Sequence, residues 1–165
     1  MLAGIGLAAI GSLAVAIGLP TDLFGSAPTE SEWRAAAHDV RIVDGETLRL
    51  GDRILRLSGL AAPQRGQACR DARGGGFDCG DAAADALARL IGGHDLTCRM
   101  QGHDSFGRGL GVCTAAETEL NAALVGNGWA MASGRDRPDL RPQQAEARRM
   151  VRGLWAAAAA PPGWH

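Results

Sequence analysis

Acids and arginines close to turns are among the side chains of this sequence that could take part in phosphate or metal chemistry. Asp44 and Glu46 flank a glycine, Arg56 falls in a strand-like run, and Arg108 lies between two glycines. Carboxylates are ligands for hard cations such as calcium, and a guanidinium group binds two phosphate oxygens at once. Taken singly, each of these residues is also typical of a solvated surface, so the surrounding sequence decides its meaning.

Three short strands are expected to position the acids and the first arginine. The runs alternate between polar and apolar side chains, and turn dipeptides of Asp-Gly and Gly-Asp separate them. The runs are residues 38–43, 46–50 and 53–60. This spacing predicts an antiparallel meander, and the glycine-containing residues 61–80 that follow are predicted to be a loop.

The rest of the chain predicts helices and two further strands. Residues 81–91 have helical apolar spacing that ends at a pair of glycines. Strand-like runs follow at 95–100 and 110–113. Thr118 is expected to cap a second helix, and Pro142 to occupy the first turn of a last one. Five strands and about three helices predict an α+β, mainly β fold, built on a five-stranded OB-type barrel.

Composition and hydropathy suggest a single folded domain after an apolar start. The chain has 165 residues, of which 46% are hydrophobic and 21% charged. Residues 1–19 carry no charged side chain and predict a signal peptide or a membrane anchor, with a misassigned start codon as the third alternative. Residues 20–36 are interpreted as a linker, 37–156 as the domain and 157–165 as a tail. The net charge of −1 leaves only a local arginine group to attract a polyanion.

An even number of cysteines in an exported domain predicts disulfides. The four are Cys69, Cys79, Cys98 and Cys113. Three pairings are possible, and the sequential one, Cys69 with Cys79 and Cys98 with Cys113, is the most economical. The close Cys-x-x-Cys pairs that a zinc site needs do not occur in the sequence.

Five segments, in order, resemble the thermonuclease (staphylococcal nuclease) family. VDGETLRL and ILRLSGLAAPQ resemble the strands that carry its first metal ligand and first catalytic arginine. HDSFGRGLGVC resembles the segment with the second arginine, and GNGWA and RGLW resemble the closing elements. The match covers about residues 37–156, and the cysteine spacing is similar to that of exported bacterial members. The resemblance implies the OB-type barrel and phosphodiester hydrolysis helped by calcium.

By the same resemblance, Arg56 and Arg108 match the two catalytic arginines, which would clamp a phosphate. Glu46 takes the position of the first metal-binding aspartate, and Asp44 lies nearby as a weaker candidate. Two positions depart from the family. Ala61 replaces the second metal-binding aspartate, and Gln64 replaces the proposed general base. An amide cannot take a proton near neutral pH, and a positioned base contributes about 10²–10⁴-fold to the rate.

We therefore expect an exported or membrane-anchored, monomeric domain that binds nucleic acid or another phosphorylated or anionic ligand, with weak or absent phosphodiesterase activity. Calcium would be weakly bound or absent. The first alternative is an active calcium-dependent nuclease for DNA or RNA, in which Asp44 and Glu46 hold the ion and Gln64 orients water. The second is a cell-envelope interaction domain. An ion pair between Glu46 and an arginine would favour the impaired site over the active one.

Overall fold

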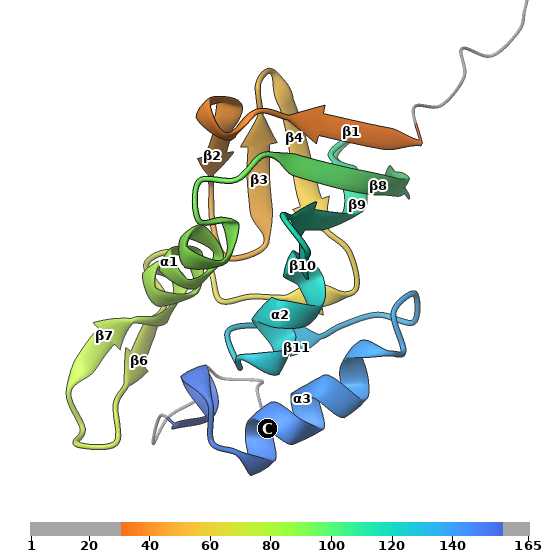
Figure 1. Cartoon of the computed structure of the whole chain (residues 1–165). Helices are drawn as coiled ribbons and strands as arrows, with labels where there is room; N and C mark the ends of the chain where they lie inside the picture. Colours follow the sequence, from red (N-terminus) through yellow and green to blue (C-terminus); the bar gives the residue numbers. More distant parts are fainter. Residues whose placement is uncertain (1–30, 157–165) are drawn as a thin grey trace, which may run out of the picture.

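The computed structural model describes residues 31–156, which fold around one curved sheet with helices along one side and end (Figure 1). Its first half contains β1 (Glu32–Ala35), η2 (Ala37–Asp39), β2 (Val40–Ile42), β3 (Thr47–Leu50), β4 (Arg53–Leu57), β5 (Leu60–Ala61), β6 (Ala68–Arg70), β7 (Gly76–Asp78) and α1 (Cys79–Ile91). Its second half contains β8 (Leu96–His103), β9 (Gly109–Ala115), β10 (Thr118–Glu119), α2 (Leu120–Gly126), β11 (Met131–Ala132), α3 (Leu140–Arg149) and η3 (Gly153–Ala156). The predicted signal or anchor at 1–19 and the tail at 157–165 lie outside the described residues.

The main sheet follows the order β1-β8-β9-β4-β3-β2, with β10 beside β9. Strands β2, β3 and β4 form the predicted antiparallel meander. Strand β4 then pairs in parallel with β9, which pairs antiparallel with β8. This arrangement, with α1, α2 and α3, confirms the expected α+β fold of OB type.

Leucines from both the strands and the helices fill the core. Their fully buried members are Leu48, Leu55, Leu57, Leu60, Leu87, Leu96, Leu120, Leu124 and Leu140. Helix α1 begins where the Asp78 carboxylate accepts a hydrogen bond from the Asp81 N–H, and it ends at Gly92, whose φ of 58° suits glycine. This packing joins the sheet and the helices in one core.

Several local predictions are wrong. Residues 32–35, assigned to the linker, form β1, because β8 supplies a full antiparallel partner from Leu96 to Arg99. The predicted loop 61–80 contains the β6–β7 hairpin, which extends away from the barrel beside α1 (Figure 1). Thr118 belongs to β10, and Glu119 takes the N-cap position of α2. Pro142 does lie in the first turn of α3.

Both disulfides follow the sequential pairing. Cys69 bonds to Cys79 across the β6–β7 hairpin, and Cys98 bonds to Cys113 between paired positions of β8 and β9. The second bond lies within the main core, where both cysteines are fully buried. In the part of the chain that the structure describes, no helix combines the length and apolar character that crossing a membrane requires.

Candidate anion-binding site

The β3–β4 pair brings the first arginine and the first acid together. Thr47 lies opposite Arg56 in the strand register, so Glu46, one residue earlier, reaches the same edge. The Arg56 Nε donates to Glu46 Oε1 at 2.7 Å, and the Ala62 N–H donates to Glu46 Oε2 at 2.9 Å. Both carboxylate oxygens of Glu46 are therefore engaged, and the carboxylate forms an ion pair instead of facing open solvent.

The carboxylate of Asp44 supports the turn between β2 and β3. Its Oδ1 accepts a hydrogen bond from the Glu46 N–H at 2.9 Å. The intervening Gly45 packs tightly, because a Cβ there would lie 2.8 Å from the Ala83 Cβ and 2.9 Å from the Ala62 Cβ. This close approach fixes the turn against α1 and keeps Asp44 beside Glu46.

The second arginine is held by an acid that the sequence analysis did not assign to the site. Asp104 Oδ2 accepts from the Arg108 Nε at 2.6 Å, and Asp104 Oδ1 accepts from the N–H groups of Phe106 and Arg108. Burial raises the pKa of Asp104, but the hydrogen bonds from Arg108 and Phe106 outweigh that effect and hold the pKa below its usual value. Asp104 is therefore ionised near neutral pH and keeps the loop closed around Arg108.

The parallel β4–β9 pair brings the two arginine–acid pairs to one region. Arg56 lies opposite Leu110, two residues after Arg108. The hydrogen bond from Glu46 raises the pKa of Arg56 although burial lowers it, and the charges of Asp104 and Asp44 add to the increase. The β3–β4 and β4–β9 pairings thus bring Glu46, Arg56 and Arg108 to one region of the sheet. Asp44 joins this region through the Glu46 N–H, and Asp104 joins it through Arg108.

Each guanidinium group is held by its Nε and keeps donors free. Among the described residues, the side-chain hydrogen bonds of Arg56 and Arg108 use Nε alone. Their side chains are 30% and 32% exposed, so the terminal nitrogens can reach a ligand. Because a guanidinium carries five N–H donors in a planar fork, each arginine can still offer a pair of parallel hydrogen bonds to a phosphate or carboxylate.

The carboxylates of this region do not fit a calcium site. Calcium takes six to eight oxygen ligands. Glu46 uses both oxygens within the protein, Asp44 uses one in its turn, and position 61 has no polar side chain. Within residues 31–156, no group of three or more His, Cys, Asp or Glu side chains is placed to hold a metal ion.

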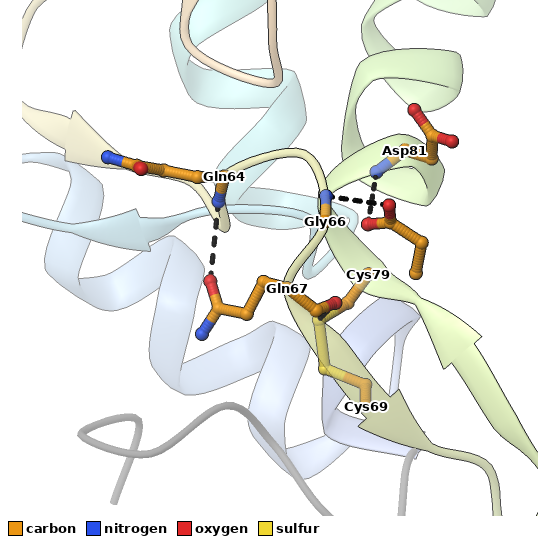
Figure 2. Close-up of a disulfide and its surroundings, with 7 residues drawn as sticks. Gln64, Gly66, Gln67, Cys69, Cys79 and Asp81 are labelled. Atoms are coloured by element: carbon orange, nitrogen blue, oxygen red, sulfur yellow. Dashed lines mark hydrogen bonds between the residues drawn. A yellow bond between two sulfur atoms is a disulfide. The ribbon is translucent and has the colours of Figure 1, made fainter.

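Gln64, at the position of the family's base, lies on a turn that the first disulfide holds (Figure 2). Its side chain is exposed and extends away from the Cys69–Cys79 bond, while its N–H donates to Gln67 Oε1 at 3.3 Å. The carbonyl of Gln67 accepts from the Cys79 N–H at 3.0 Å. The turn is thus fastened to the start of α1, which also fixes the position of Gln64.

Gly80 allows the Gln64 turn to lie directly on α1. A Cβ at position 80 would overlap the carbonyl of Gln64 and the amide nitrogen of Arg65. Gly80→Ala should lower the free energy of unfolding by about 1–3 kcal/mol, because the backbone of the turn must move. Alanine is a better helix former than glycine, so a loss of stability in Gly80→Ala would have to come from the overlap with the Gln64 turn. Urea denaturation of the oxidised chain measures the change.

Gly76→Ala is the matched control for this prediction. Gly76 is the first residue of β7, four residues before Gly80, its φ is not in the left-handed region, and nothing lies within 4 Å of an added Cβ. We expect its stability to stay within about 0.5 kcal/mol of the unaltered chain. A Gly80→Ala variant that is as stable as Gly76→Ala would show that the close packing on Gln64 is not required.

Comparison with known proteins places the chain in a family. The model of the family described as "Staphylococcal nuclease homologue" matches residues 54–157. Succinoglycan biosynthesis protein ExoI of Rhizobium meliloti (strain 1021) is 31% identical over 119 residues, which are 70% of this chain and 62% of ExoI. An uncharacterized endonuclease of Escherichia coli O157:H7 is 30% identical over 132 residues, 76% of this chain and 80% of that protein. The chain is therefore a member of the staphylococcal nuclease homologue family, with a thermonuclease-like domain.

Proposed function

We propose that this chain is an exported thermonuclease-like domain that binds single phosphate groups of nucleic acid, or of another phosphorylated ligand, and hydrolyses phosphodiesters weakly or not at all. The observation that carries the proposal is the way Glu46 and Asp104 hold the two arginines by Nε, with the terminal nitrogens left for a ligand. The named site residues comprise three acids, Asp44, Glu46 and Asp104, and two arginines. A phosphate would therefore bind through directed hydrogen bonds and not through a positive field.

Weak hydrolysis follows from what surrounds these arginines. The Glu46 carboxylate is already bound by Arg56 and Ala62, which leaves it poorly available to a cation. Gln64 can hold a water molecule through its amide but cannot take its proton. A protein with this arrangement keeps the means to orient a phosphate and lacks the groups that would activate the attacking water.

Export is supported by the two disulfides, because such bonds persist in oxidising compartments and are rare in the cytosol. We propose a location outside the cytoplasm, free or attached through the apolar residues 1–19, and a monomeric state. The second candidate function is an active calcium-dependent nuclease. It is supported by the retained arginine pair and by the Escherichia coli relatives, which are named as uncharacterized endonucleases.

The test combines binding and cleavage of a labelled single-stranded oligonucleotide by the full oxidised chain, with calcium added or chelated. We expect binding with little cleavage. Arg56→Ala should weaken binding by about 10- to 100-fold, because a charge-assisted contact is lost. Arg149→Ala is the matched control, since it removes an exposed arginine that pairs with Glu146 on α3.

The second candidate gains if the unaltered chain cuts the oligonucleotide only when calcium is present and Arg56→Ala does not. If Arg56→Ala and Arg149→Ala bind as tightly as the unaltered chain, the arginine pair is not the ligand site and the proposal fails.

A further inference from the structure

A groove of about 410 Å³ lies beside α1 and the C-terminal end of α2, two helices that pack against each other (Figure 1). Ligand pockets usually have volumes of about 300–1,000 Å³, so this groove is large enough for a small molecule. Its lining residues are Ala86, Arg89, Leu90, Asn127, Trp129, Arg152 and Gly153. None of them belongs to β4, β9 or the loop before β9, which carry Arg56 and Arg108. The groove is therefore separate from the candidate anion-binding site.

Two arginines give the groove a positive charge. Among the described residues, no acidic side chain lines it. The exposed Arg89 makes no ion pair or side-chain hydrogen bond within residues 31–156. Arg152 uses one terminal nitrogen to donate to the Gly126 carbonyl at 3.1 Å. In contrast, Arg56 and Arg108 each bind a carboxylate of the protein itself. An anion that enters the groove thus meets guanidinium groups that no acid has neutralised.

Most of the remaining lining is apolar. Ala86 and Leu90 are four residues apart and share one face of α1. Trp129 is half-buried, so part of its indole stays accessible in the groove. The exposed side chain of Asn127 makes no hydrogen bond among the described residues, which leaves its amide donors for a ligand. A ligand that suits the whole lining carries a negative charge on an apolar body.

Close backbone packing fixes one wall of the groove. The Leu154 N–H donates to the Gly128 carbonyl at 3.0 Å. A Cβ at Gly128 would overlap the Arg152 carbonyl, and a Cβ at Gly153, whose φ is 54°, would overlap the Asn127 carbonyl. Glycine at both positions allows the two segments to touch. The backbones of Asn127 and Arg152 are therefore positioned before a ligand arrives, which lowers the entropy cost of binding.

We propose that this groove binds a small organic carboxylate, with the carboxylate held by Arg89 and Arg152 and a flat apolar body against Leu90 and Trp129. The two oxygens of a carboxylate match the fork of a guanidinium group. A carboxylate carries one charge, so placing it beside an apolar lining costs less free energy than placing a doubly charged phosphate there. This site goes beyond the proposed function and does not depend on the arginine pair.

The test titrates the full oxidised chain with three probes by isothermal calorimetry. Naphthoate has both the charge and the flat body, naphthalenemethanol has the body alone, and acetate has the charge alone. We expect naphthoate to bind about 10-fold or more tightly than either, because the others lack the charge-assisted hydrogen bonds or the apolar contact. Equal binding of naphthoate and naphthalenemethanol, or no binding of naphthoate, would overturn the inference.

Arg89→Gln should weaken naphthoate binding by about 10-fold, because one charged partner is lost. Thermal unfolding should not change, since Arg89 is exposed and makes no bond within residues 31–156. Arg149→Gln is the matched control, because it removes an exposed arginine that lies outside the groove. It should bind naphthoate like the unaltered chain. If the two variants bind equally well, Arg89 does not hold the carboxylate and the inference fails.

Arg56→Ala shows whether naphthoate occupies the candidate anion-binding site instead. We expect this variant to bind naphthoate like the unaltered chain, although it binds the oligonucleotide less tightly. If Arg56→Ala loses naphthoate and Arg89→Gln does not, the probe lies at the arginine pair. The inference would then be wrong, while the proposed function would stand. Loss of the proposed function through failed oligonucleotide binding would leave the result for the groove unchanged.

Discussion

Restoring the two missing acids, by Ala61→Asp together with Gln64→Glu, should raise hydrolysis of single-stranded DNA by about 10²-fold or more over the unaltered chain. A positioned general base alone contributes about 10²–10⁴-fold. The structure leaves room for it, since the Gln64 side chain is exposed, extends from a fixed turn and makes no side-chain hydrogen bond among the described residues (Figure 2). Position 61 directly precedes the Ala62 N–H that contacts Glu46. The measurement is the cleavage rate of a labelled oligonucleotide, with calcium added and with calcium chelated.

Two controls show whether the gain comes from the proposed groups. Adding Arg56→Ala to the repaired variant should abolish the cleavage, because the phosphate loses one of its two guanidinium groups. Gln67→Glu adds the same single charge as Gln64→Glu on the same turn, without placing a carboxylate at the base position, and should leave the rate of the unaltered chain unchanged. If the repaired and unaltered chains cut equally fast, the missing acids do not limit the activity, and the impaired-site interpretation is wrong.

Much of the barrel could be predicted because its signals are local. The β2–β3–β4 meander has alternating side chains and turn dipeptides, and α1 has apolar helical spacing and a glycine after its last turn. Strand β1 lies in the part predicted to be a linker: residues 32–35 alternate between polar and apolar side chains, but the run is only four residues long. What makes them a strand is pairing with β8, more than 60 residues later in the chain. The β6–β7 hairpin was missed because its glycine-rich sequence lacks strand character and a disulfide holds it.

The sequence could predict which residues form the site, but it could not predict which hydrogen bonds they make. The family motifs indicate Glu46, Arg56 and Arg108, but only the strand register shows that Glu46 binds Arg56 and the Ala62 N–H. The sequence alone does not show the role of Asp104, four residues before Arg108. The structure shows that it also orients this arginine.

A second residue that the sequence did not predict, Asn121, supports the region of Arg56 and Arg108 from the core. Asn121 is fully buried; its amide donates to the carbonyls of Ser58 and Gly111, and its carbonyl accepts from the Cys113 N–H. It thereby joins the end of β4 to β9, the two strands next to Arg56 and Arg108. A polar residue at the start of a helix is usually exposed, so its sequence gives no hint of this role.

Replacing Cys98 and Cys113 together with alanine should lower the free energy of unfolding by about 3 kcal/mol in the chain-entropy model, because the bond closes a loop with a sequence separation of 15. For a domain of this size that is a large part of the total stability. The effect should be global, since both cysteines lie in the main core and join the paired strands β8 and β9. Urea denaturation under oxidising conditions measures it.

The Cys69→Ala/Cys79→Ala variant is the control, because its bond closes a loop with a sequence separation of 10 in a different part of the fold. Its sulfurs tie the β6–β7 hairpin to α1, away from the main core cluster. Loss of this bond should therefore appear mainly as faster proteolysis between residues 70 and 76, in addition to any change in the urea midpoint.

A reductant should make the unaltered chain less stable than both variants, since it breaks both bonds. That result would tie the stability of the domain to an oxidising compartment and so support export. If the Cys98→Ala/Cys113→Ala chain is as stable as the oxidised unaltered chain, the core does not need this bond. The disulfides would then no longer support export.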